Sequence, residues 1–365
     1  MTISVLDSNN TKLNYELYSF LLILTADVTH YKKGDNMRFF VKLFQVILYV
    51  PIQIIFIPFA IIGLLLALYK EIWKSKKLGV SFSAVKALQY RWMMHFFNTR
   101  PDSFSVAFTK HFPCESHFGM WSILGALILS WRLFGFPEKL GKLVEPGEET
   151  PDTTAGIRVL TFDRIMQENV DEVDQVVLLG SGFDLIAHHF TKGKNLAVFE
   201  IDQVNTLNVK VETLQKADIE CDWITYIPVD FSNESWDIKL LEAGFNKSRK
   251  TLFIWQSVSL YLEPDVVSTT LRRMENLCAN GSKIVQDFYS KTMVDGEYSK
   301  ATKKFKGVIE KMGEPWKFGL DMSDEPKVSV ESYLNEVGLR MTEYIQFGEK
   351  LGIEPAYCIV VAEKL

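Results

Sequence analysis

One stretch in the middle of the chain constrains the fold more than any other, because a run of apolar residues leads directly into two closely spaced glycines. Residues 176–179 read as a short buried strand, and Gly180-Ser-Gly182 follows without a spacer. Such a strand turns tightly into a helix and leaves bare backbone for a ligand. A dinucleotide site would have a third glycine where Leu185 stands, so the pattern disfavours NAD and FAD. Similar turns also occur as purely structural connections.

Strand-like runs alternate with polar segments of helix length beyond Gly156. The runs are 176–179, 196–199, 223–228, 252–255 and 283–288. This alternation predicts an α/β fold with a mostly parallel sheet. Residues 341–347 and 356–362 follow without a convincing helix between them, so we expect the sheet to close with an antiparallel pair.

Polar residues follow the predicted strands where a parallel sheet binds its ligands. They are Asp184 after the glycine turn, Glu200 and Asp202 after the second strand, Asp230 after the third, followed by the apolar Phe231, and Gln256 after the fourth. Each acid alone fits a loop or a helix cap equally well. In this order they match S-adenosylmethionine: the turn at Gly180 and Gly182 contacts the methionine part, Asp202 accepts from the ribose hydroxyls, and Asp230 with Phe231 holds the adenine.

The residues from 155 to 365 resemble the leucine carboxyl methyltransferase family of class I S-adenosylmethionine-dependent methyltransferases. The matching pieces include Ile157-Arg-Val159, Val198-Phe-Glu-Ile-Asp202, Pro228-Val-Asp230, Val258-Ser-Leu-Tyr-Leu262 and Gly313-Glu-Pro-Trp-Lys-Phe-Gly319. The resemblance implies a Rossmann-like sheet and assigns Arg158 to the carboxylate of the cofactor, which a guanidinium matches bidentately. It places Tyr261 in the lining of the pocket. The family commonly has Glu where Gln256 stands. The amide in this chain therefore lacks a negative charge near the sulfonium of the cofactor.

An uncharged segment from residue 43 to 69 is longer than the roughly 20 residues that a helix needs to cross a bilayer. It predicts a membrane anchor, either a tilted single span or a re-entrant segment bent at Pro51 and Pro58. Lysines flank both ends, so the positive-inside rule gives no orientation. A second apolar run, 118–131, is shorter and more typical of a core or interfacial helix. The polar stretch 145–152 suggests a boundary between a helical, membrane-anchoring region (1–150) and a methyltransferase domain (151–365).

The overall charge and the cysteines limit the partners. The net charge of −5 offers no basic field for nucleic acid, which we do not expect as a partner. The four cysteines lack CxxC spacing, which favours reduced thiols and a methyltransferase domain that faces the cytoplasm. No HExxH or Cys/His motif predicts a metal site.

The predicted function is a membrane-anchored O-methyltransferase that acts on a carboxylate of a small apolar or membrane-associated acceptor. A carboxylate is already ionised and needs no base, whereas a hydroxyl acceptor would need one, for which His188, His189 and Tyr261 are candidates. Two alternatives stay open. One is a methyltransferase for the terminal carboxylate of a protein, and the other is a catalytically silent membrane protein that binds the cofactor.

Overall fold

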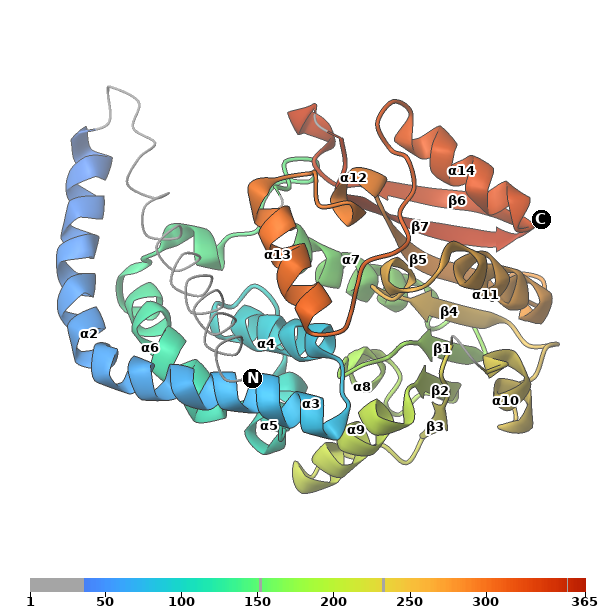
Figure 1. Ribbon diagram of the computed structural model, residues 1–365, viewed down its shortest axis with the longest axis horizontal. Coiled ribbons are helices and arrows are strands. Elements are labelled where there is room, and N and C mark those ends of the chain that lie inside the picture. Colours follow the sequence, from blue (N-terminus) through green and yellow to red (C-terminus); the bar gives the residue numbers. More distant parts are fainter. Residues whose placement is uncertain (1–35, 151–152, 232–233, 353) are drawn as a thin grey trace. The chain divides into compact units, whose positions relative to one another are not determined.

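The computed structural model describes residues 36–150, 153–231, 234–352 and 354–365 (Figure 1). Its centre is a seven-stranded sheet with the order β3-β2-β1-β4-β5-β7-β6. The strands β1 to β5 pair in parallel, and β7 runs antiparallel to both β5 and β6. The predicted α/β fold of class I methyltransferase type, mostly parallel with an antiparallel end, is therefore confirmed.

Every predicted run forms a strand. The bounds are β1 Gln175–Leu179, β2 Ala197–Asp202, β3 Ile224–Pro228, β4 Thr251–Trp255, β5 Lys283–Tyr289, β6 Leu339–Gln346 and β7 Tyr357–Lys364. The two central strands, β1 and β4, are buried at every position, as expected for strands covered by helices on both faces. The antiparallel pair contains an irregularity between Met341 and Glu343.

Helices cover both faces of the sheet. They are α7 Thr154–Asn169, α8 Ile186–Phe190, α9 Val204–Lys216, α10 Trp236–Glu242, α11 Pro264–Leu277, α12 Lys291–Val294, α13 Lys300–Lys311 and α14 Pro326–Glu336, with 3-10 turns η3 Ser259–Tyr261 and η4 Glu349–Leu351. Because side chains alternate along a strand, Val177 packs in one core with α10, α11 and α14, while Val176 packs in the other with α7 and α8. Because helices cover both faces of the sheet, the ends of the strands are the part of the sheet that remains for a ligand.

The N-terminal part is helical. Its elements are α2 Asn36–Leu68, the π-helix η1 Tyr69–Lys74, α3 Ser75–Leu78, α4 Phe82–Phe96, α5 Ser103–His111, α6 His117–Phe134 and the 3-10 turn η2 Glu138–Gly141. Pro51 and Pro58 lie inside α2, and Figure 1 shows that this helix bends along its length. Two helical stretches, Phe40–Leu78 and His117–Phe134, have the length and apolar composition of membrane spans.

The chain divides into two compact units. Among the described residues, unit 1 contains 36–69, 94–101 and 116–143, and unit 2 contains 70–93, 102–115 and those from 144 onward. Unit 2 therefore includes the sheet and two segments that precede residue 150. The boundary near residue 150 stays a prediction, since the chain enters unit 2 before that point and leaves it twice.

Candidate functional site

The glycine turn and Asp202 form a connected group at the ends of β1 and β2. Gly180 has φ +65°, and a Cβ built on it would lie 2.3 Å from Cγ2 of Val258, so only glycine fits. Gly182 has φ +48°, and its N–H donates to Oδ2 of Asp202 at 2.7 Å. Oδ1 of Asp202 accepts from the N–H of Gln203, also at 2.7 Å. Burial raises the pKa of Asp202, while both backbone hydrogen bonds oppose that rise.

The two other acids of this region are engaged inside the protein. Asp184 forms an ion pair with the buried Arg91, and its Oδ1 accepts from the N–H of Ile186 at 3.0 Å. Glu200 is 1% exposed and lies 2.5 Å from Nζ of Lys210. Burial raises the pKa of Glu200, and Lys210 opposes this effect. Both acids are predicted to bind the cofactor, and both side chains have charged partners within unit 2.

The residues after β3 and β4 lie half-buried at the same edge of the sheet. The N–H of Asp230 donates to Oε2 of Glu234 at 2.8 Å, and Phe231 packs against the core on the α10 side. Gln256 directly follows β4 and is also half-buried. Because β1, β2, β3 and β4 are parallel neighbours, these residues share one edge with Asp202.

Arg158 enters this region from α7 and joins a polar network. Its Nη1 donates to the hydroxyl of Tyr289 at 2.7 Å, and its guanidinium lies 5.8 Å from the ring centre of Tyr357. The Tyr289 hydroxyl lies 3.1 Å from Oδ2 of Asp287, whose Oδ1 accepts from the N–H of Ser257 at 2.7 Å. The Nε atom of Arg158 is buried, and no described residue forms a hydrogen bond with it. A buried donor of this kind fits an additional anionic acceptor such as a carboxylate.

A comparison with known proteins agrees with this arrangement. Residues 142–275 match the family model described as leucine carboxyl methyltransferase. The predicted resemblance to this family is confirmed. A candidate S-adenosyl-L-methionine-dependent methyltransferase from Frankia alni is 34% identical over 131 residues, which cover 35% of this chain and 45% of the relative. One from Mycobacterium ulcerans is 28% identical over 204 residues, covering 52% and 62%.

The chain spans about half the length of the curated relatives it matches. These relatives are named as S-adenosyl-L-methionine-dependent methyltransferases, which agrees with the enzyme class and the cofactor expected from the sequence. Among solved structures, a duf574 family protein from Streptomyces avermitilis has a TM-score of 0.43 at 13% identity, covering 58% of this chain and 84% of that one. Human N-acetylserotonin methyltransferase, solved with SAM, has a TM-score of 0.38 at 13% identity, covering 57% and 54%.

The three candidate bases of the methyltransferase unit are poorly suited to accept a proton. His188 is 1% exposed between the rings of Phe104 and Trp223, and burial lowers its pKa to about 3. Nε2 of His189 lies 2.9 Å from Oδ1 of Asp102, the acid that caps α5. Burial raises the pKa of Tyr261 to about 12. Both histidines therefore have structural surroundings, and Tyr261 keeps its proton at neutral pH.

Sequence reasoning missed the network beside Arg158. It took residues only from the ends of the first four strands, whereas Asp287 and Tyr289 belong to β5. An acid inside the strand-like run 283–288 was the signal, since a buried carboxylate needs partners. Ser257 carried no such signal. Its left-handed backbone, with φ +57°, is visible only in the structure.

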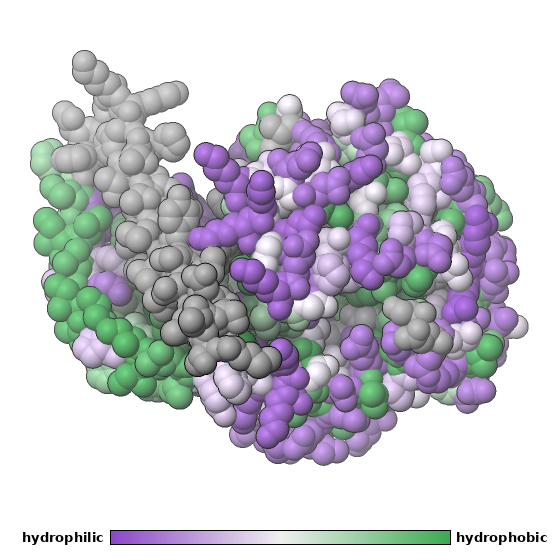
Figure 2. All heavy atoms as spheres, in the orientation of Figure 1, coloured by the Kyte–Doolittle hydropathy of each residue, from purple (hydrophilic) through white to green (hydrophobic). Residues whose placement is uncertain are grey.

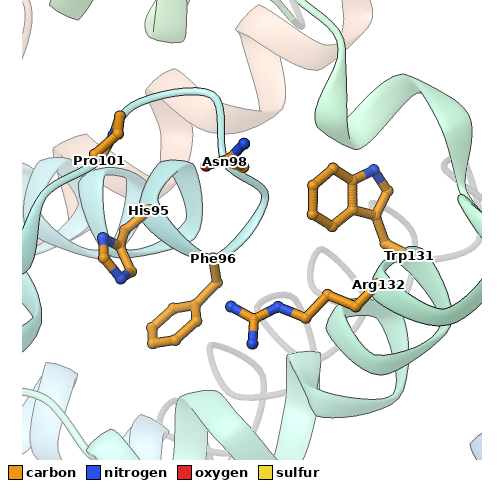
Figure 3. Close-up of a pocket in the computed structure, with 6 residues that line it drawn as sticks. All are labelled: His95, Phe96, Asn98, Pro101, Trp131 and Arg132. Carbon is orange, nitrogen blue, oxygen red and sulfur yellow. The ribbon is translucent and has the colours of Figure 1, made fainter.

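Two cavities lie outside this group of residues. The first, about 350 Å³, belongs to unit 1 (Figure 3) and is lined by His95, Phe96, Asn98, Pro101, Trp131 and Arg132. The second, about 310 Å³, lies between α9 and β3. Neither cavity contains a predicted site residue. Within the described residues, no three His, Cys, Asp or Glu side chains are grouped to hold a metal ion.

Proposed function

We propose that the chain is a membrane-anchored O-methyltransferase that transfers a methyl group from S-adenosylmethionine to a carboxylate. The acceptor is a small apolar or membrane-associated acid. The observation that carries the proposal is the joint placement of Arg158 and Asp202. The guanidinium of Arg158 has a buried Nε that no described residue binds, and the carboxylate of Asp202 is fixed to the glycine turn. Both side chains lie on elements that meet one edge of the sheet.

The residues present fit the cofactor in chemical type. When bound, S-adenosylmethionine supplies an electrophilic methyl group on a sulfonium. We assign Arg158 to the carboxylate of its methionine part and Asp202 to its ribose hydroxyls. Gly180 and Gly182 supply bare backbone, and Asp230 with Phe231 holds the adenine. Asp184 and Glu200 support this wall through Arg91 and Lys210.

A carboxylate acceptor agrees with the surroundings of the candidate bases. Methyl transfer is an in-line displacement in which the protein supplies alignment and a dry pocket. An ionised carboxylate attacks without losing a proton, whereas a hydroxyl needs a base. His188, His189 and Tyr261 are engaged or buried as described, which favours the ionised acceptor. Tyr261 then lines the pocket.

Two other functions have an observation of their own. Gln256 stands where the family commonly has an acid, which favours a silent protein that binds the cofactor without transfer. The family description favours the terminal carboxylate of a protein as acceptor. Anchoring rests on the apolar helices, which the sequence predicts to be a single span or a re-entrant segment with the methyltransferase unit in the cytoplasm.

Methyl-labelled cofactor distinguishes these functions. Membranes that contain the chain are incubated with the methyl-labelled cofactor. The lipid, small-molecule and protein fractions are then tested for methanol released by mild base. We expect base-labile label in an apolar small-molecule fraction, lost in Asp202→Ala and kept in Asp222→Ala, which changes an exposed acid. Label on protein bands supports the protein acceptor. Cofactor binding without any transfer supports the silent protein and overturns the proposal.

A further inference from the structure

The outer face of α2 is apolar and exposed to solvent in the described residues. Its exposed large side chains are Phe40, Val41, Leu43, Phe44, Ile47, Leu48, Val50, Ile54, Ile55, Ile57, Phe59, Ile61, Ile62, Leu65 and Leu66. Figure 2 shows hydrophobic residues gathered along this helix, while the visible surface of unit 2 carries many hydrophilic ones. Apolar patches of this extent on a soluble surface mark an interaction site.

The opposite face of α2 packs closely on α6, and the two helices run antiparallel. A Cβ on Gly63 would lie 2.6 Å from Cβ of Ser122, and one on Gly125 would lie 2.5 Å from the ring of Phe56. Further along, Nε2 of Gln45 donates to the carbonyl oxygen of Phe134 at 2.7 Å. Small residues allow this close approach. The two helices therefore share the same depth in any membrane.

The chain before α6 and the chain after it both belong to unit 2. Before α6, the carbonyl oxygen of Glu115 accepts from Nζ of Lys70 at 2.7 Å. After it, the carbonyl oxygen of Gly147 accepts from the N–H of Lys350 at 2.9 Å. Both ends of the intervening segment must consequently lie on the side of the membrane where unit 2 folds.

A crossing by α6 would require a return crossing that the chain does not provide. The 18 residues of α6 extend about 27 Å, close to the thickness of the hydrocarbon layer. The return, residues 135–146, contains only the 3-10 turn η2 and irregular backbone, with Glu138, Lys139, Lys142 and Glu145. Irregular backbone does not occur in contact with lipid tails, because its polar groups have no partners there. The stretch of α2 that packs along α6 does not cross either.

Basic residues stand at both ends of the antiparallel helix pair. Lys74, Lys76 and Lys77 follow α2, and Arg132 lies in the last turn of α6. Since the irregular return segment excludes a crossing, helices that lie in one leaflet place all of these basic residues among the headgroups. The lining of the unit 1 cavity combines aromatic and basic side chains, as is typical of the headgroup level of a membrane. Arg132 lies 5.6 Å from the ring centre of Phe96 (Figure 3).

We infer that α2 and α6 together dock in one leaflet of an anionic bilayer and do not cross it. The outer face of α2 lies among the acyl chains, and the basic ends lie among the headgroups. This inference rests on the membrane association in the proposed function, and it selects one-sided insertion over a span. It is independent of the methyl acceptor.

Accessibility of introduced cysteines tests the inference. The full chain is synthesised with preformed sealed vesicles of phosphatidylcholine and phosphatidylglycerol, so that unit 2 stays outside. Asn36→Cys, Lys76→Cys and Lys139→Cys are treated with a membrane-impermeant maleimide, with and without detergent, and the unchanged chain gives the background of its native thiols. We expect all three positions to react equally without detergent. Protection of position 36 or 139 until detergent is added indicates a crossing and overturns the inference.

A substitution on the apolar face tests the docking itself by flotation. Ile55 is 65% exposed on α2, and Ile238 is 53% exposed on α10, which makes Ile238→Glu the matched control for Ile55→Glu. We expect Ile55→Glu to lower vesicle binding at least tenfold and Ile238→Glu to leave it unchanged. Vesicles without phosphatidylglycerol should bind more weakly. If the chain binds no vesicles, or if it forms a dimer through α2, both the inference and the anchoring are overturned. Methyl transfer is measured separately, so a failure of the enzyme assignment can be distinguished from a failure of docking.

Discussion

Asp202 accepts a hydrogen bond from the backbone N–H of Gly182 over 2.7 Å, so the acid at the end of β2 and the turn after β1 form one unit. The acid closes the turn through one oxygen. Its other oxygen accepts from the N–H of Gln203, which orients the carboxylate plane. In the proposed site, a ribose would therefore meet a carboxylate that is already fixed, and fixed groups bind with a smaller loss of entropy.

Asp202→Asn should weaken cofactor binding about 10- to 100-fold. The substitution keeps the shape and an acceptor for Gly182 but removes the charge, and hydrogen bonds to charged groups contribute about 1.5–3 kcal/mol. Titration calorimetry with S-adenosylhomocysteine measures the effect. Asp222→Asn, at an exposed acid, should bind as the unchanged chain does. An unaltered dissociation constant in Asp202→Asn would remove Asp202 from the site.

Gly180→Ala should destabilise the protein more than Gly193→Ala does. Both glycines have positive φ, +65° and +77°, so both alanines pay about 1–2 kcal/mol of backbone strain. Only at Gly180 does the new Cβ also meet Val258, at 2.3 Å, whereas nothing lies within 4 Å at Gly193. Urea unfolding separates the two effects. Equal losses of unfolding free energy would mean that Val258 moves aside at little cost.

The sequence predicted the sheet well because its signals are local. Apolar runs of four to seven residues with polar spacers sufficed for every strand, and the order Gly180, Asp202, Asp230 followed from the parallel topology. The partners of buried charges were not predictable, because Arg91 and Asp184 or Arg158 and Tyr289 are far apart in the chain. No local pattern encodes such pairs. For the same reason, the contributions of residues 70–93 and 102–115 to unit 2 escaped the sequence analysis.

Lys210→Met should cost about 3–5 kcal/mol of unfolding free energy at pH 7, the usual penalty for leaving a buried charge unpaired. Burial already raises the pKa of Glu200, and without Lys210 it rises further. An acid whose pKa is raised in the folded state contributes stability below its unfolded pKa and loses it as pH rises. The variant should therefore be least stable at high pH and recover toward pH 5.

The matched control for this variant is Lys216→Met, which breaks an exposed ion pair with Glu212 and should cost less than about 1 kcal/mol. Adding Glu200→Gln to Lys210→Met should restore part of the stability, because the amide carries no charge. Urea unfolding from pH 5 to pH 8 gives all three values. A pH-independent loss in Lys210→Met would show that Glu200 is not the group left unpaired.

His188 should make the protein sensitive to acid. Its pKa is lowered to about 3 from an ordinary value of 6.5, since burial penalises the charged ring. Below pH 6.5 the unfolded chain binds a proton at His188 that the folded chain does not bind. The free energy of unfolding therefore decreases by up to about 1.4 kcal/mol for each unit by which the pH is lowered. His188→Phe should remove this part of the slope, and His189→Gln should keep it. Unfolding free energies at pH 7, 6 and 5 measure both slopes.

Gln256→Glu should tighten binding of S-adenosylmethionine more than binding of S-adenosylhomocysteine. The substitution places a carboxylate at the end of β4, where the family commonly has one, and only the first ligand carries a sulfonium charge. Two opposite charges about 4 Å apart attract by about 1 kcal/mol even when water screens them, which corresponds to about fivefold. Calorimetry with both ligands gives the ratio directly. If both ligands gain equally, the new acid acts on a part that they share, and Gln256 lies away from the sulfonium. If only the sulfonium ligand gains and transfer also accelerates, the amide at position 256 limits the activity of the present site.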